Sequence, residues 1–215
     1  MKLQSRAIKI PAKCNRKIEL KAIPGHFATN HSHINYYLEM TPIKCRHTEA
    51  QLVAKEMVKK YNHSTAVDTV VCMDGCEMIG AYLAEELTAA GIMSLNSHEC
   101  VNVITPEINS NGQMMFRDNI EPMVTDKHIV LVLASATTGQ TIQQSLEGIR
   151  YYGGIVEGVS ALFSAVKNVG GVEVDTIFTQ DDVGDYQTYR LGDCPFCKAQ
   201  RKLDAIVNSF GYSKI

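Results

Sequence analysis

The chain has 215 residues and a formal net charge of −2, which is enough length for one domain with a substantial core. Hydrophobic residues make up 45% and charged residues 20%, as is typical of a globular protein. The small net charge argues against a broad nucleic-acid-binding surface, and no apolar run approaches the ~20 residues needed to cross a bilayer. We therefore expect a protein that binds neither nucleic acid nor a membrane.

The compartment is predicted from the cysteines and from the N-terminal sequence. Seven cysteines at scattered spacings favour a reducing environment over a disulfide framework. The opening residues, MKLQSRAIKIPAKCNRK, contain no continuous apolar segment of the kind found in secretory signals. We therefore expect a cytoplasmic protein.

In chain order, the first forty residues show no periodicity and are expected to be irregular. A helix is expected to begin at Thr48, which precedes Gln51 at capping-box spacing, and to end near Asn62. A second helix is expected over residues 78–90, stopped by Gly91.

The rest of the chain alternates between apolar segments and helical patterns. Strands are expected at 68–73, 100–105, 129–133, 154–164 and 175–179, and further helices at 141–152 and 199–210. This alternation predicts an α/β fold with a parallel sheet. Ligands of such sheets bind beyond the carboxyl ends of the strands.

The segment 106–126 contains Asn, Gly and Pro and has little periodicity. A connection of this length in a compact domain is typical of a mobile functional loop, but a surface β-hairpin fits the residues equally well. Both interpretations stay open at this point.

The segment ATTGQT, residues 136–141, follows an expected strand and opens an expected helix. Gly139 permits a tight turn, the helix start presents free N–H groups, and three threonines add hydroxyl donors: Thr137, Thr138 and Thr141. These features predict a binding site for a monophosphate. The alternative is a threonine-rich helix cap without a ligand. Neither a dinucleotide-binding GxGxxG nor a P-loop GxxxxGK[ST] occurs.

Four segments, in order, resemble the type I phosphoribosyltransferases, and within them the orotate phosphoribosyltransferases. They are PGHFATNHSHINYY (24–37), VVCMDGCEMIGAYLAEEL (70–87), HIVLVLASATTGQT (128–141) and DYQTYRLGDCPFCKA (185–199). The resemblance spans nearly the whole chain. It implies that a small cap of N- and C-terminal segments flanks the parallel sheet. The corresponding division is a cap segment at 1–47, a core at 48–180 and a tail at 181–215 that completes the cap.

The resemblance also implies a reaction. Phosphoribosyl pyrophosphate (PRPP) would lose pyrophosphate as a ring nitrogen of a base attacks C1 of the ribose, with Mg²⁺ as cofactor. The 5′-phosphate would lie on Thr137, Thr138, Gly139, Gln140 and Thr141. The pyrophosphate and metal side would be formed by Asp74, Gly75, Cys76 and Glu77. Residues 106–126 would form a lid, and the protein would be a homodimer.

The sequence departs from the family pattern at the ribose site and on the lid. Leu133 and Ala134 stand where two adjacent carboxylates usually bind the ribose hydroxyls. The expected lid has no lysine, and Arg117 is its only cation. Asp181 and Asp182 are the candidates to supply the missing carboxylates. In the N-terminal segment, Asn30-His31 replaces the usual Ser-Gly.

Two functions are therefore kept open. The first is a phosphoribosyltransferase with altered ribose recognition, in which Asp74, Glu77 and Arg117 act on the substrate. The second is a catalytically silent relative that senses PRPP, a mononucleotide or another phosphorylated metabolite.

The cysteine and histidine pattern gives two further hypotheses. Cys194 and Cys197, in CPFC, can supply half of a zinc site, and the candidates for the rest are Cys14, Cys45 and His47. The alternative is a buried thiol pair. The crowding of His26, His31 and His33 predicts a polar pocket near the base, on which Tyr36 or Tyr37 would stack. The alternative is a surface loop with solvated histidines.

Overall fold

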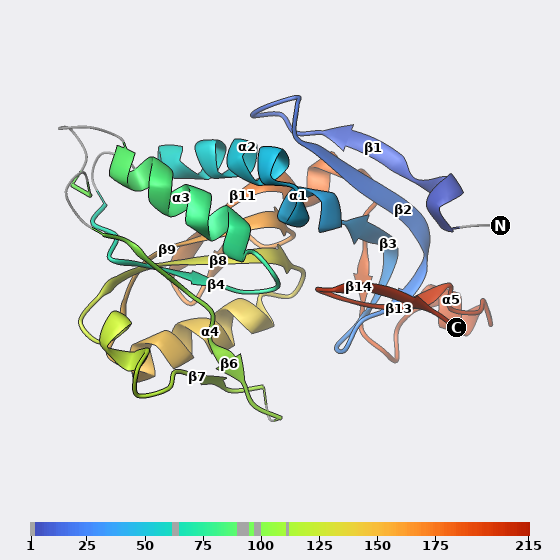
Figure 1. Ribbon diagram of the computed structural model, residues 1–215. Helices are drawn as coiled ribbons and strands as arrows, with labels where there is room; N and C mark the ends of the chain where they lie inside the picture. The colour runs from blue at the N-terminus through green and yellow to red at the C-terminus, as the bar shows by residue number, and fades with distance from the viewer. Residues whose placement is uncertain (1–2, 62–64, 90–94, 97–99, 111) are drawn as a thin grey trace.

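The computed structural model describes residues 3–61, 65–89, 95–96, 100–110 and 112–215. The described strands form a mainly parallel sheet, a second and mostly antiparallel sheet, and a separate two-stranded hairpin (Figure 1). The two larger sheets lie side by side, and the described ends of the chain both belong to the second one.

The parallel sheet has the strand order β10-β11-β9-β8-β4-β5. Neighbouring strands from β11 to β5 are parallel, and β10 pairs antiparallel with β11. Its strands are β4 (Thr69–Cys72), β5 (Asn102–Ile104), β8 (His128–Ala136), β9 (Ile155–Ser164), β10 (Asn168–Val169) and β11 (Val172–Thr179). The predicted α/β fold with a parallel sheet is confirmed.

Helices cover both faces of this sheet. On one face lie α2 (His47–Met57) and α3 (Glu77–Ala89), and on the other lies α4 (Gln140–Tyr151) (Figure 1). Each helix buries an apolar stripe, as Ile142, Leu146 and Ile149 of α4 illustrate. The two resulting clusters of buried side chains form the core on either side of the sheet.

The start of α2 differs from the sequence prediction. The helix begins at His47, and its N-cap, Arg46, makes no side-chain capping bond. The Thr48 hydroxyl bonds the carboxylate of Glu49 instead of capping the helix. A short 3₁₀ helix, η2 (Val58–Lys60), follows α2. The expected ends of the two helices, Asn62 and Gly91, lie outside the described residues.

Strand β8 is longer than predicted. It continues past Leu133 to Ala136, with Leu133 opposite Ala161 and Ser135 opposite Phe163 on β9. The small residues of LASA interrupt the run of large apolar side chains, which explains why the sequence suggested an earlier end. The positions of the missing acidic pair therefore lie within the sheet.

The second sheet is built from both ends of the chain, as the resemblance implied. Its order is β12-β3-β2-β13-β14, and β1 also pairs with β2. Its strands are β1 (Ile8–Pro11), β2 (Glu19–Ala28), β3 (His33–Glu39), β12 (Thr188–Tyr189), β13 (Ala205–Asn208) and β14 (Gly211–Lys214). A short helix, α1 (Thr41–Cys45), joins this sheet to α2.

Two predictions about these terminal segments were wrong. The first forty residues are mainly strands. The sequence did not predict them because a register shift between Pro24 and Phe27 breaks the two-residue alternation that marks a strand. Residues 199–210, all of which the structure describes, do not form the expected helix. A short helix, α5 (Pro195–Lys198), comes earlier. Pairing of β13 with β2 and β14 outweighs the local helical spacing.

The segment 106–126 contains a hairpin, one of the two alternatives left open. Strands β6 (Glu107–Ile108) and β7 (Met114–Met115) pair antiparallel, and a 3₁₀ helix, η3 (Glu121–Met123), follows. The hairpin lies below α4 in Figure 1. A Cβ atom added at Gly148 of α4 would lie 2.9 Å from Cβ of Met114, so a glycine is needed for this close contact.

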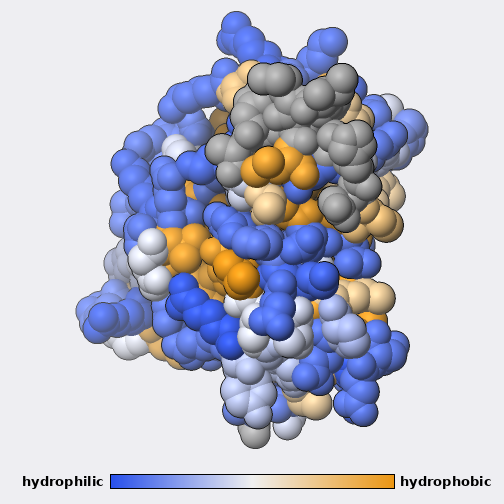
Figure 2. Space-filling view, turned by 90° about the vertical axis from the view of Figure 1, so that its left-hand side faces the viewer, coloured by the Kyte–Doolittle hydropathy of each residue, from blue (hydrophilic) through white to orange (hydrophobic). Residues whose placement is uncertain are grey.

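The face of the molecule drawn in Figure 2 is mainly polar. On the face turned towards the viewer in Figure 2, apolar side chains form small separate patches among hydrophilic ones. Among the described helices, none combines the length and apolar character needed to span a bilayer.

Candidate functional site

A cavity of about 250 Å³ lies between the carboxyl end of β8 and the second sheet. Its lining includes the β2–β3 turn, α1, the loop after β4, the β8–α4 segment and the β13–β14 turn. Segments far apart in the sequence therefore meet at the edge of the sheet where α/β proteins bind ligands.

The β8–α4 segment forms one wall of the cavity. All residues from Ala134 to Thr141 line it, including the five proposed to hold a phosphate. Gly139 is the N-cap of α4 and has a left-handed backbone, with φ of 77°. The first N–H groups of a helix have no acceptor within the helix, and the positive end of its dipole lies there. This wall therefore has the donors that a phosphate requires.

The loop after β4 contains an unusual turn. Asp74 has φ of 60° and Gly75 has φ of 76°, so two consecutive residues adopt the left-handed conformation. This conformation costs a residue other than glycine about 1–2 kcal/mol. Strain of this kind accumulates at functional sites, which makes the Asp74 turn a candidate for a functional role.

Lys44 of α1 holds this turn in place. Its side chain is buried, and its ammonium donates hydrogen bonds of 2.6 Å to the backbone oxygens of Asp74 and Ser209. Lys44 also lines the cavity, where it is the only lysine or arginine among the described lining residues. The sequence alone did not single it out, because an isolated lysine on a short helix carries no motif.

Asp74 is the only carboxylate among the described residues that line the cavity. Burial raises the pKa of its carboxyl, and this effect exceeds the opposing ones of the hydrogen bond from Ser209, nearby Lys44 and the N–H of Ala134. The carboxyl of Asp74 therefore lies against the backbone of Ala134, one of the two positions where the family usually has an acid.

The side chains of Leu133 and Ala134 have different surroundings. Leu133 is fully buried in the core beneath α4, whereas Ala134 lines the cavity. Successive side chains of a strand point to opposite faces, so an acid at position 133 would be buried in the apolar core. Of these two positions, only 134 lines the cavity.

The other expected acids do not line the cavity. Asp182 accepts hydrogen bonds from the N–H and hydroxyl of Thr179 and pairs with Lys13 at 2.7 Å. Asp181 lies beside it in a 3₁₀ turn, η4 (Gln180–Asp182). Glu77 is exposed and accepts a hydrogen bond of 3.2 Å from Thr105.

The remaining two residues of the proposed pyrophosphate loop also lie outside the described cavity lining. Cys76 is fully buried, and burial raises the pKa of its thiol, so it stays neutral. Gly75 adjoins the Lys44 ammonium, which would lie 3.6 Å from a Cβ atom added there. The cavity lining thus brings together Asp74 and residues 137–141, but not Gly75, Cys76 or Glu77.

Arg117 also lies away from the cavity lining. Its guanidinium pairs with Glu107 of the hairpin through hydrogen bonds of 2.9 and 2.6 Å. Both side chains are exposed. In this conformation, the cation of the proposed lid is neutralised on the hairpin itself.

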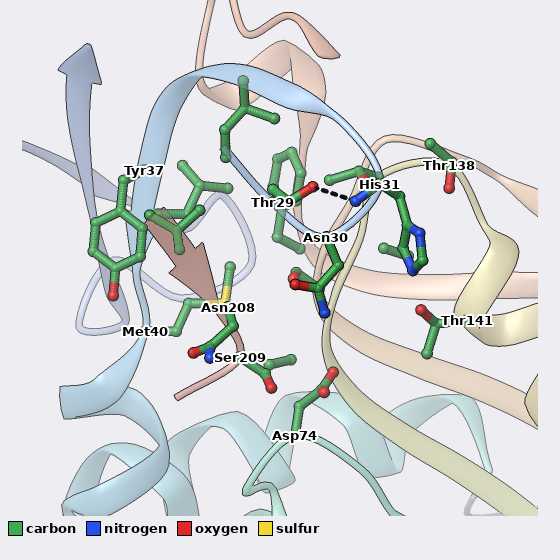
Figure 3. A pocket seen from close by; sticks show the side chains of 18 of the residues that line it. Thr29, Asn30, His31, Tyr37, Met40, Asp74, Thr138, Thr141, Asn208 and Ser209 are labelled. Carbon is green, nitrogen blue, oxygen red and sulfur yellow. Dashed lines mark hydrogen bonds between the residues drawn. The ribbon is translucent and has the colours of Figure 1, made fainter. Parts of the chain in front are cut away.

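Amides and aromatic rings also line the cavity. Figure 3 shows the Asn30 amide and the Asp74 carboxyl pointing into the same space from opposite sides, with Thr141 beside them. His31, Tyr37, Phe163, Tyr186 and Asn208 also line the cavity. Tyr36 lies outside the described lining and donates to Asp185 at 2.7 Å. The lining therefore combines aromatic rings with polar groups of the kind that bind a heterocyclic base.

The three histidines of the N-terminal segment separate. His31 lines the cavity, but His26 and His33 gather with Cys194 and Cys197 in a group that can hold a metal ion. The candidate partners Cys14, Cys45 and His47 are not in this group, so that part of the prediction was wrong. The β2–β3 register brings the two histidines together, which spacing in the sequence does not show.

The fold and the site can be compared with known proteins. No protein-family model matches the chain. It is 26% identical over 182 residues to the orotate phosphoribosyltransferase of Pelotomaculum thermopropionicum, a match that covers 82% of this chain and 85% of that protein.

Among solved structures, the chain is similar to the orotate phosphoribosyltransferase of Mycobacterium tuberculosis. The TM-score is 0.50 at 15% identity, over 77% of this chain and 93% of that one. The described architecture is therefore that of the type I phosphoribosyltransferases, and the resemblance inferred from the sequence is confirmed.

Proposed function

From this type I phosphoribosyltransferase fold, we propose that the protein binds PRPP in the cavity and transfers its phosphoribosyl group to a nitrogenous base. The observation that carries the proposal is the meeting of the phosphate-binding segment 137–141 and the Asp74 carboxyl in one cavity. Orotate is the first acceptor to test, because the relative that matches most of the chain is an orotate phosphoribosyltransferase.

The reaction needs no covalent bond to the protein. A ring nitrogen of the base forms a bond to C1 of the ribose, the bond from C1 to the pyrophosphate oxygen breaks, and the proton on the nitrogen passes to solvent. Pyrophosphate leaves with the electron pair of the broken bond. The chain contributes by positioning the reactants and stabilising the charge on the leaving group.

The 5′-phosphate is assigned to the start of α4. Backbone N–H groups of residues 139–141 and the hydroxyls of Thr137, Thr138 and Thr141 are the donors. The left-handed backbone of Gly139 allows a phosphate to approach the chain closely.

The ribose is assigned to Asp74 in place of the missing acidic pair. The carboxyl of Asp74 interacts with the Ala134 backbone and faces the cavity, so it lies near the usual location of the acids. A hydrogen bond to a charged group contributes about 1.5–3 kcal/mol. One carboxylate in place of two predicts weaker ribose binding than in enzymes with the full pair.

The residues of the cavity also fit Mg²⁺. This ion usually takes one or two protein carboxylates together with phosphate oxygens of the substrate, and Asp74 can supply one carboxylate. When bound, Mg²⁺ would neutralise charge on the departing pyrophosphate. Lys44 adds a fixed positive charge beside the Asp74 turn, where the family places the pyrophosphate.

The test is turnover. Purified protein, PRPP and Mg²⁺ are incubated with orotate, uracil, adenine, guanine or hypoxanthine, and the pyrophosphate released is measured. We expect base-dependent release with at least one acceptor and loss of release when EDTA removes Mg²⁺. Absence of release above the no-enzyme control with every base would reject the transferase.

A second function is favoured by one observation. Where the family has a carboxylate, the cavity has the methyl group of Ala134, which weakens the hold on the ribose. A catalytically silent sensor of PRPP or a mononucleotide would need only the phosphate-binding segment, residues 137–141. Calorimetry separates the two functions: a sensor binds PRPP or a nucleoside 5′-monophosphate without releasing pyrophosphate, and binds the dephosphorylated nucleoside much more weakly.

A further inference from the structure

Four side chains from opposite ends of the chain meet within the second sheet. His26 lies in β2 and His33 in β3, whereas Cys194 is the N-cap of α5 and Cys197 lies within that helix. Their ligand atoms all lie within 4.8 Å of one another. None of the four is among the described residues that line the cavity. We propose that these four residues bind a structural Zn²⁺ ion.

The distances within the group match a tetrahedral zinc site. Zinc–nitrogen bonds of about 2.05 Å and zinc–sulfur bonds of about 2.3 Å place two nitrogens ~3.3 Å apart and a nitrogen and a sulfur ~3.6 Å apart. Here Nε2 of His26 lies 3.0 Å from Nδ1 of His33. Three of the four sulfur-to-nitrogen distances are 3.4, 3.6 and 3.3 Å, and every pair of ligand atoms lies within 4.8 Å. Small outward shifts would accommodate the ion.

The orientation of His26 is fixed by a backbone partner. Its Nδ1 lies 2.9 Å from the carbonyl oxygen of Arg201. A carbonyl oxygen only accepts, so Nδ1 carries the proton and Nε2 directs its lone pair towards the two sulfurs. Zinc-binding histidines typically donate their second N–H in this way, which fixes the ring and its tautomer.

The surroundings favour a structural role. His26, His33 and Cys194 are 1%, 9% and 0% exposed, and Cys197 is the one exposed member of the group. Phe196 packs beside His26, and the guanidinium of Arg201 lies over the Phe196 ring. Four protein ligands leave no position for a substrate, as is typical of closed structural zinc sites.

The site would join the two ends of the chain. His26 and Cys194 are separated by 168 positions in the sequence. The turn between β2 and β3 carries Asn30 and His31 into the cavity, so zinc would also hold one wall of the proposed binding site. The inference itself stands independently of the reaction proposed for that cavity.

The first experiment uses the wild-type protein alone. It is purified under reducing conditions without chelator, and its zinc content is measured by mass spectrometry. Protein stripped by a chelator is then titrated with Co²⁺ and followed by visible absorption. We expect about one zinc per chain, and the intense absorption of thiolate-bound tetrahedral cobalt, saturating at one equivalent.

The second experiment compares matched variants. Cys194→Ser, Cys197→Ser and His33→Ala should each lower the zinc content below about a tenth of an equivalent. The control variants Cys45→Ser and His47→Ala change exposed residues outside the group and should keep the zinc. Removing zinc from the wild type should lower its melting temperature by at least about 5 °C.

Three results would overturn the proposal. The first is wild-type protein that neither contains zinc nor binds Co²⁺ at one equivalent with thiolate absorption. The second is zinc that stays bound in Cys194→Ser and Cys197→Ser. The third is a Cys194–Cys197 disulfide in place of metal in protein purified under reducing conditions. The wild-type titration decides the question even when a variant fails to fold.

Discussion

The Lys44 ammonium lies 2.6 Å from the backbone oxygen of Asp74 and donates a hydrogen bond to it. A second bond of 2.6 Å reaches the backbone oxygen of Ser209, so one buried cation joins the loop after β4 to the β13–β14 turn. Both segments line the cavity. Lys44 therefore links the geometry of the proposed pyrophosphate side to the second sheet.

The first prediction concerns this lysine. Lys44→Met keeps the length of the side chain but removes both hydrogen bonds and the charge. Loss of a charged donor from these two partly buried carbonyls should lower the free energy of unfolding by about 2 kcal/mol, measured by urea denaturation. The affinity for PRPP should fall at least about fivefold. The exposed Lys202→Met is the matched control. Equal PRPP affinity in Lys44→Met and wild type would contradict the role assigned to Lys44.

The second prediction is a pH dependence. Burial raises the pKa of Asp74, and a carboxyl with a raised folded-state pKa stabilises the fold only below that pKa. Its contribution is lost as pH rises through the folded-state value. Asp74→Asn, which tolerates a left-handed backbone, should therefore be at least as stable as wild type at pH 7.5, and the difference should shrink towards pH 4.5.

The same variant should bind PRPP at least about tenfold more weakly, because an amide is a poorer acceptor for a ribose hydroxyl than a carboxylate. Melting temperature against pH and calorimetry at pH 7.5 measure the two effects. A variant that loses stability at neutral pH and binds PRPP normally would show that Asp74 is purely structural.

The third prediction concerns the phosphate-binding segment, residues 137–141. Gly139→Ala adds a Cβ atom 2.8 Å from Val169 at a residue with φ of 77°. It should lower the free energy of unfolding by about 1–2 kcal/mol and weaken the binding of PRPP and of inorganic phosphate. Gly171→Ala is the matched control, because φ is 82° there and the added atom meets nothing within 4 Å. Equal phosphate affinity in the two variants would contradict the assignment.

The fourth prediction concerns the hairpin. Arg117 pairs with Glu107 and does not line the cavity. Arg117→Ala should leave the affinity for inorganic phosphate within about twofold of wild type and barely change stability, since exposed ion pairs contribute little. Calorimetry measures the affinity. A tenfold loss would show that Arg117 reaches the phosphate in solution.

The parallel sheet could be predicted because its strands are continuous apolar runs that alternate with amphipathic helices. The second sheet could not. Its strand β2 contains Pro24, Gly25 and a register shift, and β13 gains its partners only when the two ends of the chain meet. Local sequence patterns carry no information on strand pairing between residues almost two hundred positions apart, such as Phe27 and Ala205.

The candidate site was also only partly visible in the sequence. Residues 137–141 form one continuous segment, so their shared position follows from chain order. Lys44 and the Ala134–Asp74 contact depend on how α1 and two neighbouring strands pack. His26 and His33 could be recognised as a pair only from the β2–β3 register.

A crystal structure of the protein with PRPP and Mg²⁺ would test the proposed binding mode directly. We predict the 5′-phosphate on the N–H groups and hydroxyls of residues 137–141, with the Asp74 carboxyl within hydrogen-bonding distance of a ribose hydroxyl or of the metal. PRPP bound with its 5′-phosphate away from residues 137–141, or with Asp74 contacting neither the sugar nor the ion, would contradict the account.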